Sequence, residues 1–475
     1  MEDYVSFLDK KTHVGCEHGF EPTFMPDMLF PFQHSLVEWS TRKGRAAVFA
    51  DCGLGKTFIQ LTWAENVARQ TNGRVLILTP LAVSFQTVLE GAKIGVEVIQ
   101  RKTGMEKSDR IVVTNYERLH YFNPCDFDGV VCDESSILKH FTGATQMEVT
   151  RFLTKIKYRL LCTATAAPND YIELGTSSEA LAELSNSEML KRFFKQLDDK
   201  GQKKEMREQG RNEKLAQHFA KLSFRVHQSI GQWRLKRHAE TDFWRWVCSW
   251  ARACRKPSDL GFDDTGFILP QLIERNHIIT PHTPPEGMLF TLPAIGLQEE
   301  REERRRTLTQ RCEFVAELVN HDKPAVVWCH MNDEGKLLEK IIPGAREIAG
   351  CTPDEEKEEI YRDFASGKLL KLVIKPKIGA WGLNWQHCAH VVTFASHSYE
   401  QYYQSVRRCW RFGQKSDVRL DVVATLGEAG VISNMLRKSD QADAMFRVMV
   451  EEMNKAQKVK RPESGKKEME LPSWL

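Results

Sequence analysis

The sequence predicts an α/β fold with two parallel-sheet lobes in tandem and a mainly helical insert between them. Short apolar runs alternate with helical patterns from about residue 45 to 165, and the same alternation returns from about 325 to 425. A third observation is the strongly charged stretch 198–214, which interrupts the alternation. Because strands that alternate with helices usually form parallel sheets covered on both faces, we expect one such sheet in each block.

The predicted strands are runs of five to eight residues, apolar on both faces. In the first block they are 46–50, 74–79, 96–100, 111–115, 129–134 and 158–165. In the second block they are 325–330, 345–350, 369–375, 390–395 and 418–425.

This pattern divides the 475 residues into five expected parts. They are an N-terminal extension at 1–28, a first lobe at 29–180, a helical insert or linker at 181–320, a second lobe at 321–440, and a C-terminal helix and tail at 441–475.

The composition favours a cytoplasmic protein that is neither secreted nor embedded in a membrane. No apolar run approaches the ~20 residues of a membrane helix, and the N-terminus lacks the pattern of a signal peptide. The twelve cysteines contain no C-x-x-C motif, so buried free thiols fit better than a disulfide framework. The net charge of +3 is too small to indicate nucleic-acid binding by itself.

A candidate phosphate-binding loop lies between the first predicted strand and an apolar helix. The segment ADCGLGKT, residues 50–57, matches G-x-x-x-x-G-K-[ST] except that Ala50 replaces the first glycine. Glycines allow backbone N–H groups to point at phosphate oxygens, and the helix N-terminus adds positive partial charge. The candidate ATP contacts are Gly53, Leu54, Gly55, Lys56 and Thr57. Lys56 would reach the β- and γ-phosphates, and Thr57 would bind Mg²⁺.

A pair of acidic residues ends a neighbouring predicted strand in VVCDESS, residues 130–136. Asp133 stands where a Mg²⁺-holding carboxylate is needed, and Glu134 could orient the attacking water. The alternative is a strand end at which Ser135 and Ser136 cap the following helix.

The second block contains the pattern Q-x-x-x-R-x-x-R at Gln404, Arg408 and Arg411. On a helix the two arginines would share one face, and Arg407 would face elsewhere. A planar, always-charged guanidinium matches phosphate oxygens and can stabilise charge in phosphoryl transfer. The alternative is a solvated basic helix. We predict Lys56, Asp133, Glu134, Gln404, Arg408 and Arg411 as the catalytic set.

These motifs, together with several others in order, resemble the superfamily 2 helicases and their SWI/SNF-like branch. The further segments are PFQHSLVEW (31–39), LTPLAVSFQ (78–86), VTNYERL (113–119), CTATAAPND (162–170), VVWCHMNDEGKLLEK (326–340) and KPKIGAWGLNWQH (375–387). The resemblance covers about 30–180 and 320–430. It implies RecA-like lobes, ATP and Mg²⁺ as cofactors, and a nucleic-acid partner.

The resemblance also implies roles for individual residues. Gln33 would read the adenine, and Gly382 would contact the nucleotide. The implied nucleic-acid contacts are Pro80, Ser84, Thr114, Thr163, Thr165, Lys375, Lys377 and Asn384. For each of these segments alone, strand-end and turn chemistry is an adequate explanation.

The sequence departs from the family pattern at several positions. The usual acidic pair of the phosphate loop is reduced to Asp51-Cys52, and Trp410 stands where histidine is common. The segment 375–377 reads Lys-Pro-Lys where Ser-Thr-Arg is usual, and 163–165 reads Thr-Ala-Thr. With no chromatin-reading module in view, a compact bacterial or phage-type member is expected, in a bacterial or phage-infected cytoplasm.

The segment 239–257 combines aromatic and basic residues. Phe243, Trp246, Val247 and Trp250 recur at helical spacing and are expected to form a core face. The interleaved basic cluster of Arg245, Arg252, Arg255 and Lys256 is expected to contact DNA, with a solvated basic face as the alternative.

The expected function is an ATP-dependent DNA helicase or translocase acting on duplex or partly duplex DNA. An RNA helicase would have the same ATP site, so RNA remains an alternative partner. A non-hydrolysing, nucleotide-gated DNA-binding scaffold is the third possibility. Protein partners could bind through the insert or the tail.

Overall fold

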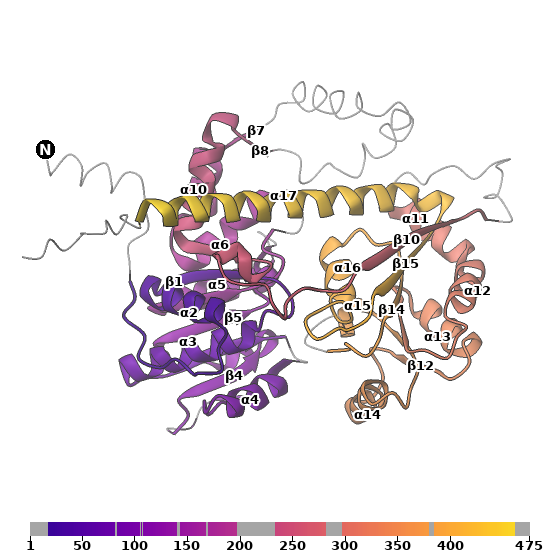
Figure 1. Cartoon of the computed structure of the whole chain (residues 1–475), viewed down its shortest axis with the longest axis horizontal. Helices are drawn as coiled ribbons and strands as arrows, with labels where there is room; N and C mark the ends of the chain where they lie inside the picture. The colour runs from indigo at the N-terminus through magenta and orange to yellow at the C-terminus, as the bar shows by residue number, and fades with distance from the viewer. Residues whose placement is uncertain are drawn as a thin grey trace, which may run out of the picture.

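The computed structural model describes residues 18–80, 83–104, 106, 108–139, 143–167, 170–196, 233–281, 297–379 and 384–460. Two parallel sheets stand side by side, each with helices on both faces (Figure 1). The predicted class of two tandem RecA-like lobes is therefore confirmed.

The sheet of the first lobe has seven strands in the order β3-β4-β2-β5-β6-β1-β9, and every neighbouring pair is parallel. Its strands are β1 (Arg45–Ala50), β2 (Val75–Thr79), β3 (Ile99–Gln100), β4 (Ile111–Asn115), β5 (Gly129–Asp133), β6 (Tyr158–Cys162) and β9 (Ala251–Cys254). Its helices are α2 (Pro31–Lys43), α3 (Lys56–Thr71), α4 (Ser84–Lys93), α5 (Ala144–Leu153), α6 (Leu174–Leu181), α7 (Asn186–Phe193) and α10 (Glu240–Trp250). A short antiparallel pair, β7 (Phe194–Gln196) and β8 (Trp233–Leu235), follows α7.

The sheet of the second lobe has six parallel strands in the order β10-β15-β14-β11-β13-β12. They are β10 (Leu272–Ile279), β11 (Ala325–Trp328), β12 (Ala345–Ile348), β13 (Lys371–Ile374), β14 (His390–Phe394) and β15 (Val418–Thr425). The helices are α11 (Leu297–Arg306), α12 (Leu308–Leu318), α13 (Asn332–Ile341), α14 (Asp354–Ala365), α15 (Pro376–Gly379), α16 (Tyr399–Val406) and α17 (Ala429–Lys460).

The segment expected as a helical insert contributes one strand to each sheet. β9 extends the first sheet beside β1, and β10 pairs with β15 along its whole length. The sequence pattern missed β10 because an edge strand exposes polar side chains, as LIERNHII does, and it missed β9 because four residues directly follow a strong helical pattern. The domain boundaries at 181 and 320 stay a prediction. β9 and β10 lie between these boundaries, but each belongs to the sheet of one lobe.

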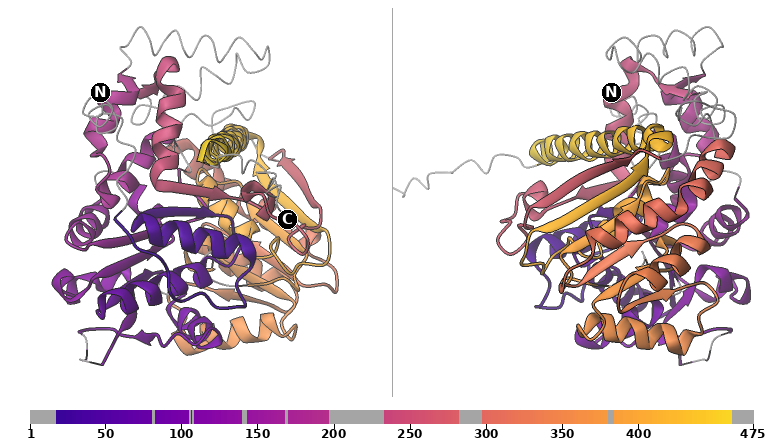
Figure 2. Two further views of the ribbon diagram at one scale, coloured as in Figure 1. Left: turned by 60° about the vertical axis from the view of Figure 1, so that its left-hand side comes forward. Right: turned by 90° about the vertical axis from the view of Figure 1, so that its right-hand side faces the viewer.

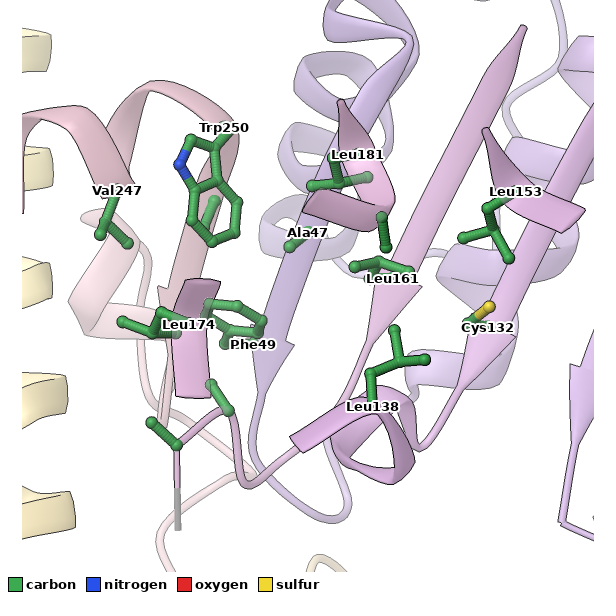
Figure 3. Close-up of a cluster of buried hydrophobic side chains, with 14 of the residues drawn as sticks. Ala47, Phe49, Cys132, Leu138, Leu153, Leu161, Leu174, Leu181, Val247 and Trp250 are labelled. Atoms are coloured by element: carbon green, nitrogen blue, oxygen red, sulfur yellow. The ribbon is translucent and has the colours of Figure 1, made fainter. Parts of the chain in front are cut away.

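The first lobe has a core on each face of its sheet, and α10 closes one of them. Phe243, Trp246, Val247 and Trp250 are buried there, so the expected core face is confirmed. The rings of Trp250 and Phe49 meet edge to face, with centroids 6.2 Å apart (Figure 3).

Three basic residues of the same segment form contacts within the protein, and the role of the cluster in DNA contact stays a prediction. Arg255 lies 2.7 Å from a carboxylate oxygen of Asp443, and Lys256 lies 3.5 Å from Asp264. The Arg252 guanidinium binds the carbonyl of Cys248 and lies over the ring of Trp39. Asp443 belongs to a helix almost 190 positions further along, so local sequence could not reveal this pairing.

Helix α17 starts in the second lobe and crosses to the first (Figures 1 and 2). Near its start, Val431 and Met435 are buried in the core of the second lobe. Further along, Met445, Phe446 and Met449 are buried against α10 and β9 of the first lobe. The helix therefore holds the two lobes together on one side of the molecule.

No helix within the described ranges is both long and apolar enough to cross a bilayer.

The packing of α17 against the first lobe leads to a prediction about the stability of the protein. Met449 is 1% exposed, so Met449→Ala removes buried apolar surface and should lower the free energy of unfolding by roughly 2–5 kcal/mol. Thermal unfolding followed by circular dichroism should show a lower midpoint. Leu436→Ala is the matched control, because Leu436 lies on the same helix and is 44% exposed. Equal shifts for both variants would contradict the packing of α17 described above.

Candidate nucleotide site between the lobes

The phosphate loop joins β1 to α3 through two glycines in left-handed backbone. Gly53 and Gly55 have φ angles of 89° and 71°. A Cβ atom at Gly55 would collide with the amide of Gln33, and one at Gly53 would lie 3.0 Å from the backbone nitrogen of Phe412. Both positions therefore need glycine for backbone conformation and for space.

Gln33 fastens α2 to this loop. Its Nε2 donates to the carbonyl of Leu54 at 2.9 Å, and its Oε1 accepts from the N–H of Phe30 at 3.0 Å. The side chain is buried. Gln33 thus lies at the loop as expected, and its role in reading adenine stays a prediction.

Lys56 begins α3 and folds its ammonium back over the loop. Its Nζ lies 3.0 Å from the carbonyl oxygen of Ala50 and 3.4 Å from that of Asp51. Burial alone would lower the pKa of Lys56, but Cys52, Glu134 and other nearby acidic groups raise it above its ordinary value. The group therefore stays cationic, as a phosphate ligand must. Thr57 follows as the second residue of α3 and is partly exposed.

Asp133 ends β5 and faces the start of α3. Gln60 donates to its carboxylate at 2.6 Å, and the Tyr116 hydroxyl donates to its backbone carbonyl at 2.6 Å. Burial and the neighbouring Glu134 raise the pKa of Asp133 to about 7. A carboxylate that is costly to ionise without a counter-charge is suited to hold a cation.

Gln60 is a site residue that sequence reasoning missed. It lies one turn after Lys56 on α3 and is buried beside Asp133. The available signal was a polar side chain four positions after the lysine, on the same face of the predicted helix.

Glu134 adopts a left-handed backbone conformation with φ of 49°, which is uncommon outside glycine. Its carboxylate accepts a 3.5 Å hydrogen bond from the hydroxyl of Thr163, at the end of β6. The hydroxyls of Ser135 and Ser136 are buried and have no hydrogen-bond partner among the described residues. The alternative in which these serines cap the next helix is therefore not supported.

A chain of hydrogen bonds leads from Glu134 to the second lobe. Thr163 accepts from the N–H of Thr165 at 3.1 Å, and the hydroxyl of Thr165 donates to Glu400 of α16 at 3.4 Å. Lys139, which follows β5, forms an ion pair with the same Glu400. Glu134 of the first lobe is thus linked to α16, the helix that ends just before Arg408 and Arg411.

The arginine pattern meets the phosphate loop, although not on a helix. α16 ends at Val406, so Arg408 and Arg411 lie in turns and do not share a helix face, contrary to the prediction. The backbone N–H groups of Arg408 and Cys409 bond three residues back, which tightens the chain after α16. Two arginines three positions apart in the sequence are therefore as consistent with such turns as with a helix.

Gln404 and Arg408 together contact the loop at Cys52. The thiol of Cys52 lies 3.5 Å from Gln404 Oε1, and Arg408 Nη2 donates to the same oxygen at 2.8 Å. Arg408 Nη2 is also 3.9 Å from the Cys52 sulfur. All three side chains are almost completely buried. Arg408 therefore does not lie on a solvated basic face, which was the alternative interpretation.

Arg411 joins two predicted motifs of the second lobe. Its guanidinium binds the side chain of Asn384, and its Cβ lies close to Gly53 of the phosphate loop. Burial and the nearby Arg408 lower its pKa to about 10, which leaves it charged at neutral pH. Gly382 lies outside the described residues.

Arg407 was expected to face away from the site, and the structure contradicts this. Its guanidinium forms an ion pair with Asp51 of the phosphate loop, and Tyr403 donates a hydrogen bond to the same carboxylate. Because α16 ends one residue earlier, Arg407 takes a direction that helical spacing does not predict.

The residues implied as nucleic-acid contacts fall into two groups. Ser84, Thr114, Thr163 and Thr165 are buried, and Pro80 is partly buried, so these side chains do not form an exposed surface here. Lys377 and Asn384 are exposed, and Lys375 binds Asn332 at the start of α13. Their nucleic-acid contacts stay predictions.

The residues present fit ATP and Mg²⁺. The loop offers a cradle that side chains would fill, and the buried Gln404 Nε2 has no hydrogen-bond partner among the described residues. Thr57 and Asp133 would hold the metal. No group of three or more His, Cys, Asp or Glu residues in the described ranges could enclose a metal by itself. Mg²⁺ binds through few carboxylates together with substrate phosphates and water. Bound ATP would supply the phosphoanhydride bond to be cleaved.

A comparison with protein families gives a match within the second lobe. Residues 310–413 match the family described as the helicase conserved C-terminal domain. The matched residues include α16 and both predicted arginines.

No curated protein matched the sequence. Among solved structures, the chain is similar to one titled "Sulfolobus solfataricus SWI2/SNF2 ATPase core in complex with dsDNA", at 16% identity and a TM-score of 0.40, over 92% of this chain and 98% of that one.

The contact between Gln60 and Asp133 predicts a pH effect. Gln60 stabilises the ionised carboxylate, so Gln60→Leu should raise the pKa of Asp133 further. Because a metal ligand must be deprotonated, the acid limb of ATPase activity at subsaturating Mg²⁺ should move to higher pH by roughly one unit. Gln86→Leu is the control, since Gln86 pairs with Glu90 on α4. An unchanged acid limb would exclude Asp133 as the titrating group.

Proposed function

We propose that this protein is an ATP-dependent DNA translocase or helicase, which couples ATP hydrolysis to movement along duplex or partly duplex DNA. One observation carries the proposal: the phosphate loop of the first lobe contacts the arginine-bearing segment of the second. Neither lobe alone holds the complete set of Lys56, Asp133, Glu134, Arg408 and Arg411.

Each group has a role that its surroundings favour. Lys56 and the loop N–H groups would bind the phosphates, and Thr57 with Asp133 would hold Mg²⁺. Glu134 would position the attacking water, and Arg408 with Arg411 would stabilise charge on the transferred phosphoryl group. Since the arginines come from the other lobe, hydrolysis would require closed lobes and product release would favour opening.

DNA is proposed as the nucleic acid along which the protein moves. The reason is that the exposed Lys377 and the partly exposed Lys375 follow β13 on the side of the second lobe that carries the site. Contacts to phosphate predict little sequence preference and strong salt dependence. A protein that moved along RNA would have the same ATP site. A non-hydrolysing scaffold is less favoured, because such a protein has no need for a complete set of catalytic groups.

The proposal is tested by ATPase assays with duplex DNA, single-stranded DNA and RNA. Duplex DNA should stimulate hydrolysis most. Lys56→Ala should lower the stimulated rate about 100-fold or more through loss of phosphate binding. Glu134→Gln should lower kcat by a factor of about 10²–10⁴ while nucleotide binding persists.

Stimulation by RNA alone would overturn the choice of DNA. If the purified protein hydrolyses no ATP with any nucleic acid and Lys56→Ala behaves like the wild type, the scaffold function would replace the enzyme.

A second prediction concerns Lys377. If it contacts backbone phosphate, Lys377→Ala should weaken DNA binding equally for different sequences and reduce the slope of log affinity against log salt by about 1. Fluorescence anisotropy at several salt concentrations measures both quantities. Lys368→Ala serves as the control, because Lys368 is 77% exposed on the same lobe and lies near Asp363. Identical salt slopes for the wild type and Lys377→Ala would exclude this contact.

A further inference from the structure

The phosphate loop carries a buried carboxylate whose counter-charge comes from the other lobe. Asp51 is 6% exposed and lies two positions before Gly53. One carboxylate oxygen accepts the N–H of Cys52 at 2.6 Å and the hydroxyl of Tyr403. The other oxygen pairs with Arg407. Within the described residues, both side chains that bind the Asp51 carboxylate belong to the second lobe.

Several contacts hold Arg407 in the position that makes this pair. It is 3% exposed, and its guanidinium lies 4.8 Å from the ring centroid of Trp410 and 5.6 Å from that of Tyr403. Nη1 also donates to the carbonyl of Trp410 at 3.2 Å, and Nη2 lies 3.4 Å from the carbonyl of Cys52. A planar cation fixed between rings loses little entropy when it binds a carboxylate.

The Asp51 charge bears directly on the phosphate position. The backbone carbonyl of Asp51 lies 3.4 Å from Lys56 Nζ, and its carboxylate contributes to the raised pKa of that lysine. A bare carboxylate at this place would repel a polyphosphate and would also compete with it for Lys56. With Arg407 paired, the net charge of the Asp51 side chain and its partner is zero.

We propose that Arg407 makes the nucleotide affinity of the phosphate loop depend on lobe closure. In the closed arrangement Arg407 neutralises Asp51, so the loop holds polyphosphate tightly. When the second lobe moves away, Asp51 loses both of its side-chain partners, its negative charge acts on the phosphates, and the affinity falls. Arg407 is thus a positioning residue that links lobe movement to nucleotide release, and Asp51 supplies the repulsion. This inference rests on the proposed ATP site and adds a determinant of its affinity.

The test is a double-mutant cycle read out as the dissociation constant for magnesium-bound ADP and for a non-hydrolysable β,γ-imido ATP analogue. Arg407→Gln should weaken binding about tenfold, because the unpaired Asp51 charge would repel the phosphates at an effective dielectric constant of ~20. Asp51→Asn should bind at least as tightly as the wild type. The combined variant should bind within about threefold of Asp51→Asn, because no repulsive charge remains.

Two further variants separate charge from packing. Arg407→Lys keeps the positive charge and should restore most of the affinity lost in Arg407→Gln. Arg346→Gln is the matched control, since Arg346 forms an exposed ion pair with Glu356 of the same lobe, 2.8 Å apart. Thermal unfolding of each variant verifies that the binding constants refer to folded protein.

The outcomes distinguish this inference from the proposed function. If Arg407→Gln binds nucleotide as the control does, or if the combined variant binds as weakly as Arg407→Gln, the inference is overturned while the ATP site stands. Equal loss in Arg407→Lys and Arg407→Gln also overturns it, because packing would then explain the effect. A wild type that binds nucleotide without hydrolysing it would refute the proposed function alone. A wild type that binds no nucleotide would refute both.

Discussion

The docking of the segment around α16 onto the phosphate loop is the constraint on which the rest of the site depends. Both sheets are parallel, so each lobe gathers its polar side chains at the carboxyl ends of its strands. At this junction Asp51, Cys52, Gln404, Arg407 and Arg408 are nearly excluded from water. Electrostatic interactions are stronger where water is excluded, so small relative movements of the lobes alter them considerably.

The charges at the junction depend on one another. Asp133 is hard to ionise because it is buried beside Glu134, while Lys56 is kept protonated by the same acidic neighbours. Across the junction, burial lowers the pKa of Arg411 and so disfavours its charged form. Burial thus disfavours the charged forms of Asp133 and Arg411, and a polyphosphate with a divalent cation would bring an opposite charge to each.

Sequence reasoning identified the two lobes and their central strands because those strands are apolar on both faces, a signal that is local. It also selected the loop, Asp133 and Glu134, which the structure brings to one end of the first sheet. It could not find β10, whose exposed edge looks polar, or the direction of Arg407, which depends on the helix ending at Val406. Gln60 escaped for a related reason: its importance comes from a partner 73 positions away.

The two anchors of α17 limit how the lobes can move. The helix has 32 residues, which corresponds to a rod of about 48 Å at ~1.5 Å per residue. A rod fixed at one end in each lobe keeps the distance between its anchors constant, so the lobes cannot simply spread apart along that side. What remains is a scissor-like rotation about the rod, in which the opposite side travels furthest. If the lobes move as proposed, the reach of that movement would be set by the width of the lobes, measured from α17.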